Sequence, residues 1–292
     1  MDFGRLIVAM ATPFREDLEL DPGKAVELAK RLIADGVDAL VLSGTTGESP
    51  TLTRQEKIDL IKAVRKAVSV PLIGNAGTNS TAASIQNALD AEEAGADGLL
   101  LVAPYYNKPD QGMLYDHFAA IASSVKIPSM LYNVPGRTGI SIRPETVVKL
   151  SRDVPNITML KDAAGVLDDT TIVIKNAAPG FRVYTGEDSL TLPTLAIGGY
   201  GVVSVTGHVA GGIMKKMIEA YLAGENAEAA ALHVKLQAIN KALFLQPNPV
   251  PVKMALRLCG FNAGSLRAPL KDASTEVTAA LHAALADLGL LK

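Results

Sequence analysis

The stretch Ile157-Thr-Met-Leu-Lys161-Asp162 places a lysine at the end of a short apolar run that is typical of a buried strand. Burying an ammonium group is costly, so such a lysine either extends to water beside Asp162 or is kept for its amine. An ordinary lysine titrates near ~10.4, and only the neutral amine attacks a carbonyl. Because desolvation among apolar strand ends favours the neutral amine, Lys161 is a candidate nucleophile.

Seven other apolar runs share the chain with this one, and a helical pattern follows each of the eight. The continuous Val, Leu, Ile and Met character of the runs favours a parallel sheet that is buried on both faces. Eight strand-helix units predict an α/β fold of the (β/α)8 TIM barrel type. The expected strands are Leu6–Met10, Ala39–Leu42, Pro71–Gly74, Gly98–Val102, Pro128–Tyr132, Asn156–Leu160, Phe181–Tyr184 and Gly201–Val205. The expected helices begin near residues 22, 54, 80, 113, 143, 167, 189 and 212.

The pattern changes to helix alone from about Gly224. Helices are expected over Asn226–Phe244, Pro251–Leu258 and Thr275–Leu288, with a proline-rich break before the second. We therefore expect a catalytic barrel over residues 1–224 and a C-terminal helical appendage over residues 225–292.

Composition limits the possible functions. The 292 residues carry 28 basic and 30 acidic side chains, a net charge of −2, with no block of like charge. Neither a nucleic-acid partner nor a membrane partner is indicated, and a small-molecule role fits better. Cys259 is the single cysteine, which excludes an internal disulfide and is consistent with a reducing cytosol. No signal peptide and no apolar run of ~18 residues is present, so a soluble cytoplasmic protein is expected.

Reactive side chains gather at the predicted strand ends, where the active sites of such barrels lie. The strand ends carry Ser43–Glu48, Pro104–Tyr106, Tyr132–Asn133, Lys161 and Thr185–Glu187. One amine among hydroxyl groups and backbone donors suits carbonyl chemistry, because a Schiff base needs proton shuttles and fixed donors for the substrate carboxylate. The tyrosines would also fit simple packing at the rim, and Gly-Thr-Thr-Gly would fit a tight turn. Their convergence on one rim favours the catalytic interpretation.

The longer motifs resemble one known family nearly from end to end. They are Gly44-Thr-Thr-Gly-Glu48, Pro104-Tyr-Tyr-Asn-Lys-Pro109, Tyr132-Asn-Val-Pro-Gly-Arg-Thr-Gly139, Lys161, Gly186-Glu-Asp188 and Asn248-Pro-Val-Pro-Val-Lys253. The chain is similar to the dihydrodipicolinate synthase family, which belongs to the pyruvate-dependent class I aldolases. This resemblance implies a lyase that condenses pyruvate with L-aspartate 4-semialdehyde, the first committed step toward diaminopimelate and lysine.

The resemblance also implies roles for single residues. Lys161 would form a Schiff base with pyruvate, and Tyr132 would donate and accept the proton at that centre. Thr45 would pass the proton to Tyr106, a residue that in the family reaches the site of a neighbouring subunit. The chain is therefore expected to form a tight homodimer, usually paired again into a tetramer.

Four further residues complete the expected substrate-binding set. Thr46, through its hydroxyl and its backbone N–H, and the backbone of Val203 would hold pyruvate, and Gly186 belongs to the same set. The guanidinium of Arg137 would take the carboxylate of the semialdehyde in a bidentate way, and this role is favoured over the alternative of a surface ion pair. Relatives that cleave sialic acid or other keto sugar acids tend to carry a different residue at this place, so Arg137 favours a synthase.

Two departures from the family pattern bear on the second substrate. Asp162-Ala163-Ala164-Gly165 stands where Glu-Ala-Thr-Gly is usual, and Gly207-His208 stands where Ala-Asn is usual. Two alternatives therefore remain beside the synthase. One is a lyase of the same superfamily that cleaves a 2-keto-3-deoxy sugar acid, and the other is a non-catalytic pyruvate-binding barrel.

Regulation by lysine is not expected. In feedback-inhibited relatives two histidines and a glutamate line the lysine site, and the corresponding residues here are Arg54, Lys57 and Ala83. A cationic effector would meet two cations and lose its counter-ion, so inhibition is expected to be weak or absent.

No metal and no cofactor are expected beyond the covalent pyruvate Schiff base on Lys161. The four histidines show no metal-ligand spacing to one another or to Cys259. They are His117, His208, His233 and His282. The glycine-rich stretches Gly74–Gly77 and Gly207–Gly212 match neither dinucleotide-binding nor P-loop patterns.

Overall fold

The computed structural model describes residues 1–291, and its eight strands follow one another in the order of a closed barrel from β1 to β8. Neighbouring strands pair in parallel, for example Ile7 with Ala39 and Tyr132 with Lys161. The predicted (β/α)8 barrel is confirmed. The strands are β1 (Leu6–Ala9), β2 (Ala39–Leu42), β3 (Leu72–Asn75), β4 (Gly98–Val102), β5 (Ser129–Asn133), β6 (Ile157–Asp162), β7 (Arg182–Thr185) and β8 (Gly201–Ser204).

The strands form where the sequence is apolar at consecutive positions. All four residues of β2 are buried, as are the residues of β1 and β8. A strand that is covered on both faces cannot alternate apolar and polar residues, which explains the continuous runs. The ends of these strands are the places where polar side chains appear.

Helices connect the strands, and their starts are marked by local signals. The helix α2 begins after Thr53, whose Oγ1 accepts the Glu56 N–H at 3.2 Å, while the Glu56 carboxylate accepts the Thr53 N–H at 2.8 Å. The helices are α1 (Pro22–Ala34), α2 (Arg54–Ala67), α3 (Thr81–Glu93), α4 (Gln111–Ala122), α5 (Pro135–Thr138), α6 (Pro144–Asp153), α7 (Leu167–Asn176), α8 (Thr191–Ala196), α9 (Gly207–Leu222), α10 (Asn226–Ala242), α11 (Val250–Leu258) and α12 (Thr275–Asp287), with short 3-10 turns at Ser49–Thr51 and Asp188–Leu190.

Two helical features differ from the sequence-based expectation. The four-residue helix α5 was not expected; it starts at Pro135, ends at Thr138 and is capped by Gly139, whose φ of 75° favours glycine. The helix α9 begins at Gly207 rather than near Gly212, because a first turn precedes a non-helical residue, Ala210, with φ −130° and ψ 32°.

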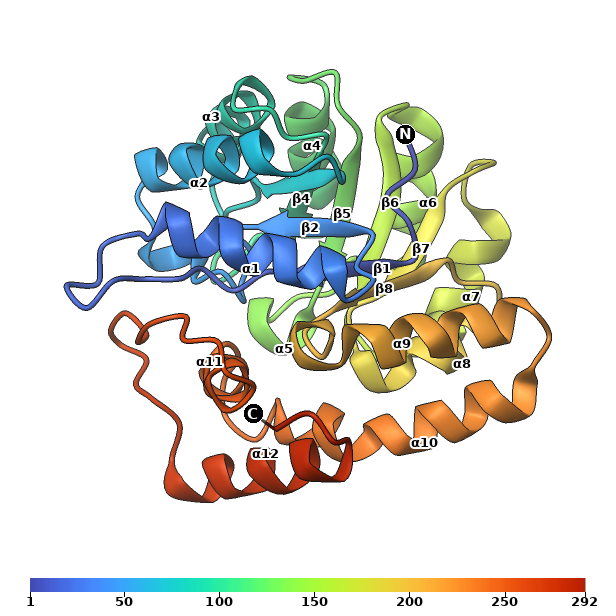
Figure 1. The fold of residues 1–292 in the computed structure, drawn as a ribbon. Coiled ribbons are helices and arrows are strands. Elements are labelled where there is room, and N and C mark those ends of the chain that lie inside the picture. Colours follow the sequence, from blue (N-terminus) through green and yellow to red (C-terminus); the bar gives the residue numbers. More distant parts are fainter. Residues whose placement is uncertain (292) are drawn as a thin grey trace. The chain divides into compact units, whose positions relative to one another are not determined.

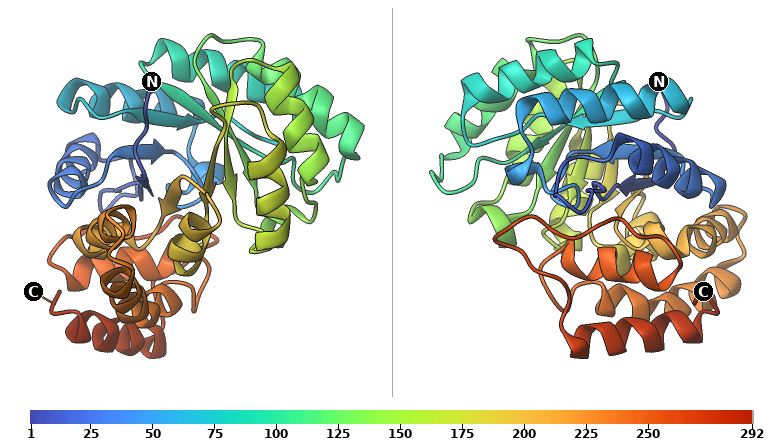
Figure 2. Two further views of the ribbon diagram at one scale, coloured as in Figure 1. Left: turned by 90° about the vertical axis from the view of Figure 1, so that its right-hand side faces the viewer. Right: turned by 60° about the vertical axis from the view of Figure 1, so that its left-hand side comes forward.

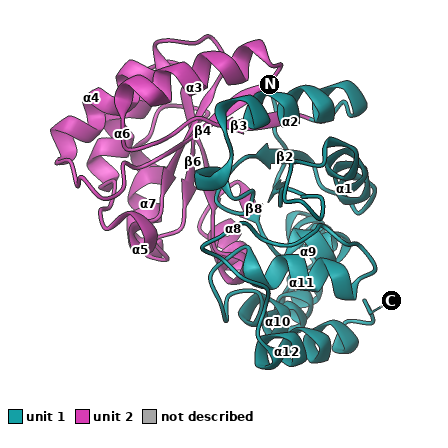
Figure 3. Ribbon diagram, turned by 90° about the vertical axis from the view of Figure 1, so that its left-hand side faces the viewer, with its two compact units in different colours: residues 1–70, 204–292 teal, residues 71–203 magenta. Residues whose placement is uncertain are grey.

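The chain divides into two compact units (Figure 3). One contains residues 1–70 and 204–292, with β1, β2 and the helices from α9 to α12, and the other contains residues 71–203. Within the first unit α10 packs against α9 and α12, and α11 packs against α9 and α12 (Figures 1 and 2). The expected boundary between residues 224 and 225 therefore stays a prediction. Over residues 1–291, no helix combines the length and apolar character that crossing a membrane requires.

Candidate active site

Lys161 lies beside Tyr132 at the ends of β6 and β5. The two residues are register partners on neighbouring strands, and each is 6% exposed. The Lys161 Nζ lies 4.2 Å from the centroid of the Tyr132 ring. A ring face at this distance attracts an ammonium and leaves the amine beside an apolar surface. The sequence-based expectation that these two side chains meet agrees with this geometry.

Gly186 adjoins Lys161 where β7 ends. A Cβ placed on Gly186 would lie 2.9 Å from the Lys161 Cε and 2.8 Å from the Ala163 Cβ. Real Cβ atoms do not approach so closely, so a Cβ here would force the lysine side chain and Ala163 to shift. The Gly186 N–H donates to the Asp162 carbonyl at 2.6 Å and fixes this approach. The glycine therefore sets the path that the lysine side chain follows.

Glu187 follows Gly186 and is half-buried. Burial is the largest cause that raises the pKa of its carboxyl group, and the neighbouring Asp188 raises it further. The positive charges of Lys161 and Arg137 oppose this rise, so the carboxyl lies within electrostatic reach of both. Sequence reasoning quoted Glu187 only as part of a motif and gave it no role. A carboxyl with a raised pKa near a candidate nucleophile is a candidate acid-base group.

Arg137 and Val203 occupy different settings in the same unit. Arg137 is exposed on the short helix α5, just before a turn in which the Thr138 hydroxyl donates to the Ile140 carbonyl at 2.8 Å. Val203 is fully buried in β8, next to Val202, the register partner of Thr185. The guanidinium is therefore accessible to an anion from solvent, whereas only the backbone of Val203 can take part in polar contacts.

Tyr106 extends away from the chain. Its side chain is 89% exposed, and its φ of 74° is uncommon for a bulky residue. The neighbouring Tyr105 is 40% exposed. Tyr106 is thus not packed with Lys161 and Tyr132 inside one copy of the chain.

Thr45 and Thr46 belong to the other unit, in the loop after β2. Ser43 and Glu48, at the two ends of this loop, both have left-handed backbone conformations, with φ values of 57° and 56°. The Glu48 N–H donates to the Thr45 carbonyl at 3.0 Å, and the Thr12 hydroxyl donates to the Gly47 carbonyl at 2.8 Å. One local hydrogen bond and one from Thr12 therefore fix the backbone that carries both threonines.

Two side chains of the C-terminal helical segment, Asn248 and Lys253, contact this loop. Asn248 Nδ2 donates to Thr46 Oγ1 at 2.8 Å. Lys253 Nζ lies 2.7 Å from the Glu48 carboxylate, and the two side chains are 3% and 1% exposed. Burial lowers the pKa of Lys253, and the Glu48 charge opposes that shift. Lys253 also donates to the Ser265 carbonyl at 3.0 Å, which adds a second partner for the buried ammonium.

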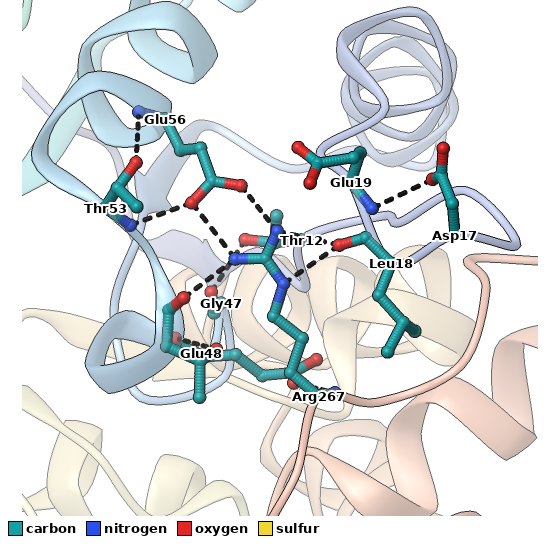
Figure 4. Close-up of polar contacts among 10 residues, drawn as sticks. Thr12, Asp17, Leu18, Glu19, Gly47, Glu48, Thr53, Glu56 and Arg267 are labelled. Carbon is teal, nitrogen blue, oxygen red and sulfur yellow. Dashed lines mark hydrogen bonds and ion pairs between the residues drawn. The ribbon is translucent and has the colours of Figure 1, made fainter.

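Arg267 also forms hydrogen bonds with the threonine loop and with neighbouring segments (Figure 4). Its backbone N–H donates to the Glu48 carboxylate at 2.9 Å, and its guanidinium donates to the Leu18 carbonyl at 2.7 Å. The guanidinium also donates to the Glu56 carboxylate at 3.0 Å, and this bond is the main cause that lowers the Glu56 pKa to about 2. One side chain thereby joins the segment before α1 to the first turn of α2.

Comparison with known proteins decides the family. Residues 2–288 match the family model described as the Dihydrodipicolinate synthetase family. The chain belongs to this family. It is 50% identical over 293 residues to the 4-hydroxy-tetrahydrodipicolinate synthase of Moorella thermoacetica, covering 100% of each chain. It is 47% identical over 290 residues to the enzyme of the same name from Bacillus subtilis, covering 99% of this chain and 100% of that one.

Solved structures agree with the family assignment. A dihydrodipicolinate synthase from Bacillus anthracis superposes with a TM-score of 0.96 at 45% identity, covering 98% of each chain. A dihydrodipicolinate synthase from Cyanidioschyzon merolae with lysine bound gives a TM-score of 0.97 at 43% identity, covering 99% of each chain.

The first departure from the family pattern has a structural explanation. Successive strand residues point to opposite faces, so Asp162 faces away from Lys161. Its carboxylate accepts Asn133 Nδ2 at 3.1 Å, the Ala164 N–H at 3.2 Å and the Thr170 hydroxyl at 2.9 Å. Asp162 therefore ties β5 and β6 to α7.

The second departure, His208, is likewise a buried packing residue. Its Nδ1 donates to the Val205 carbonyl at 2.8 Å, and its Nε2 accepts the Ala11 N–H at 3.0 Å. Burial lowers the pKa of this ring to about 4. His117 is also buried, with a pKa lowered to about 4, and contacts the Thr81 hydroxyl. Among the described residues, no three His, Cys, Asp or Glu side chains cluster as metal ligands would.

Sequence reasoning missed the residues that hold the threonine loop. Asn248 and Lys253 were quoted only as a motif of the resemblance, and Arg267 was not singled out. A single-sequence signal exists only for the first two, because their motif interrupts an otherwise helical region with prolines.

Proposed function

We propose that the protein is a 4-hydroxy-tetrahydrodipicolinate synthase that condenses pyruvate with L-aspartate 4-semialdehyde through an imine on Lys161. The observation that carries the proposal is the position of the Lys161 amine, buried at the end of β6 and 4.2 Å from the Tyr132 ring. The names of the full-length relatives support the same substrates.

The covalent steps follow from the amine. The neutral Lys161 amine adds to the keto carbon of pyruvate and expels water, which leaves a protonated imine. That imine accepts electrons from the methyl group as a proton leaves, giving an enamine. The enamine carbon attacks the aldehyde of the semialdehyde, and the substrate's own amine then displaces Lys161 as the ring closes. One water is released overall.

Proton transfer is assigned to hydroxyl groups. Tyr132, whose ring adjoins the amine, would exchange the proton during imine formation, with Thr45 passing it to Tyr106. Because Tyr106 is 89% exposed in one copy of the chain, we assign it to the site of a second copy. The functional unit is then a homodimer, with a tetramer as the expected larger assembly, in the cytoplasm.

Substrate binding is assigned to the remaining residues. The Thr46 hydroxyl and N–H and the Val203 backbone would hold pyruvate, while Gly186 keeps open the path of the lysine side chain. Arg137, exposed on α5, would bind the carboxylate of the semialdehyde through its planar fork. No metal takes part in these steps.

Borohydride trapping tests the proposal. Incubation with pyruvate and borohydride, followed by mass spectrometry, is expected to modify the peptide that carries Lys161. The variant Lys161→Arg should give no adduct, whereas the matched control Lys175→Arg, at an exposed position of α7, should react as the wild type does. A wild type without an adduct would identify a non-catalytic binding barrel.

Turnover assays separate the remaining alternative. The semialdehyde is expected to be consumed with pyruvate, and a panel of 2-keto-3-deoxy sugar acids is expected to be left intact. Cleavage of a sugar acid without condensation would instead identify a lyase of the same superfamily.

A further inference from the structure

A hydrogen bond from the C-terminal helical segment holds the side chain of Thr46. Asn248 Nδ2 donates to Thr46 Oγ1 at 2.8 Å, between residues 202 positions apart. The two residues are 7% and 2% exposed, so water does not compete for the contact. In such surroundings a hydrogen bond is stronger and its geometry is well defined.

The direction of this bond decides what the threonine can do. A threonine hydroxyl has one proton and two lone pairs, and the Asn248 N–H occupies one lone pair. The hydroxyl proton is then left to donate to another group, and a carboxylate can only accept. We infer that Asn248 is a positioning residue that makes the Thr46 hydroxyl a hydrogen-bond donor to the carboxylate of pyruvate. This inference rests on the proposed function, which assigns Thr46 to pyruvate.

The backbone around Thr46 is fixed independently of Asn248. The Gly47 carbonyl accepts the Thr12 hydroxyl at 2.8 Å, and the Glu48 carboxylate pairs with Lys253 at 2.7 Å. Loss of Asn248 therefore leaves the loop in place and releases only the rotation of the Thr46 hydroxyl. The expected effect falls on the affinity for pyruvate and not on the fold.

Two substitutions at residue 248 give different predictions. Asn248→Ala removes the donor and should raise the KM for pyruvate about 3- to 10-fold, the effect of one net hydrogen bond. Asn248→Asp places an acceptor there, which captures the Thr46 proton and adds a negative charge beside the substrate carboxylate. Its KM for pyruvate should rise roughly 100-fold or more. Asn226→Ala and Asn226→Asp, at an exposed position of α10, are the matched controls and should leave the KM for pyruvate unchanged.

A double-mutant cycle shows whether Asn248 acts through the threonine. Thr46→Val removes the hydroxyl, and in that background Asn248→Ala should have no further effect on the KM for pyruvate. Additive effects, or an Asn248→Asp variant with the KM of the wild type, would overturn the inference. If the alanine variant does not fold, Asn248→Ser replaces it in the cycle, with the same expectation of non-additivity.

Three other readouts separate positioning from general damage. The KM for the semialdehyde, the kcat at saturating pyruvate and the melting temperature of Asn248→Ala should stay close to those of the wild type. A higher KM for the semialdehyde, a lower kcat and a lower melting temperature, together with the rise in the KM for pyruvate, would show a merely structural role and overturn the inference.

Borohydride trapping distinguishes failure of this inference from failure of the proposed function. If the wild type forms no pyruvate adduct on Lys161, both the proposed function and the inference about Asn248 are refuted. If the wild type forms the adduct, and Asn248→Asp reaches half-maximal labelling at the same pyruvate concentration as the wild type, only the role assigned to Asn248 is refuted.

Discussion

Replacing His208 by asparagine is expected to make the free energy of unfolding less sensitive to mild acid. The His208 ring is 2% exposed, and its Nε2 accepts the Ala11 N–H. If the ring were protonated, its Nε2–H would face the Ala11 N–H, and two donors would oppose each other. The folded protein therefore keeps the ring neutral. Burial accordingly lowers its pKa from 6.5 to about 4.

The sign and the size follow from the two pKa values. The unfolded chain takes up the proton below pH 6.5, whereas the folded protein takes it up only near pH 4. Stability is therefore greatest above pH 6.5 and is lost as the pH falls toward 4. The loss is about 1.4 kcal/mol for each pH unit, or about 3 kcal/mol over the whole interval.

Urea unfolding of the wild type and His208→Asn at pH 7, 6 and 5, at one protein concentration, measures this difference. Asparagine carries an amide oxygen that accepts and an amide nitrogen that donates, and its amide does not take up a proton in this pH range. The stability gap between the two proteins should change by about 2 kcal/mol from pH 7 to pH 5, in favour of the variant. His117, with a pKa also lowered to about 4, is present in both proteins and cancels. If the free energies of unfolding of the two proteins keep a constant difference from pH 7 to pH 5, the reasoning is refuted.

Three more predictions concern the site and its support. Gly186→Ala puts a Cβ 2.9 Å from the Lys161 Cε, so trapping with pyruvate should slow about 100-fold while circular dichroism stays unchanged; normal trapping would contradict the close approach. Lys253→Met leaves the Glu48 carboxylate buried without its partner and should cost about 3–5 kcal/mol in urea unfolding, whereas adding Glu48→Gln should restore most of it. Lysine at millimolar concentration should leave the rate unchanged because Arg54 and Lys57 are cationic, and a clear drop would show that an effector still binds.

The barrel was predictable because each strand appears in the sequence as its own run of consecutive apolar residues. The expected strand Pro128–Tyr132 corresponds to β5 (Ser129–Asn133), and the expected strand Asn156–Leu160 corresponds to β6 (Ile157–Asp162). Boundaries shifted by one or two residues because polar side chains at strand ends still pair with neighbouring strands. The helix α5 was missed because four residues are too few to show a helical period.

The candidate site was predictable only where its residues end strands. Lys161 and Tyr132 were expected to meet because neighbouring parallel strands end on the same rim. The contacts of Asn248, Lys253 and Arg267 carry no such signal, since their partners lie about two-thirds of the chain away and no periodicity relates them. The exposure of Tyr106 was expected from the resemblance and could not be derived from the pattern of the strand before it.

The bond between Asn248 and Thr46 has a consequence for synthesis on the ribosome. The threonine loop emerges early, but its partner is translated 202 residues later. At about 5–20 residues per second, the nascent loop waits roughly 10–40 s for that amide. During translation the barrel strands can pair while the hydroxyl stays unoriented, so competence to bind substrate is acquired among the last events of biogenesis.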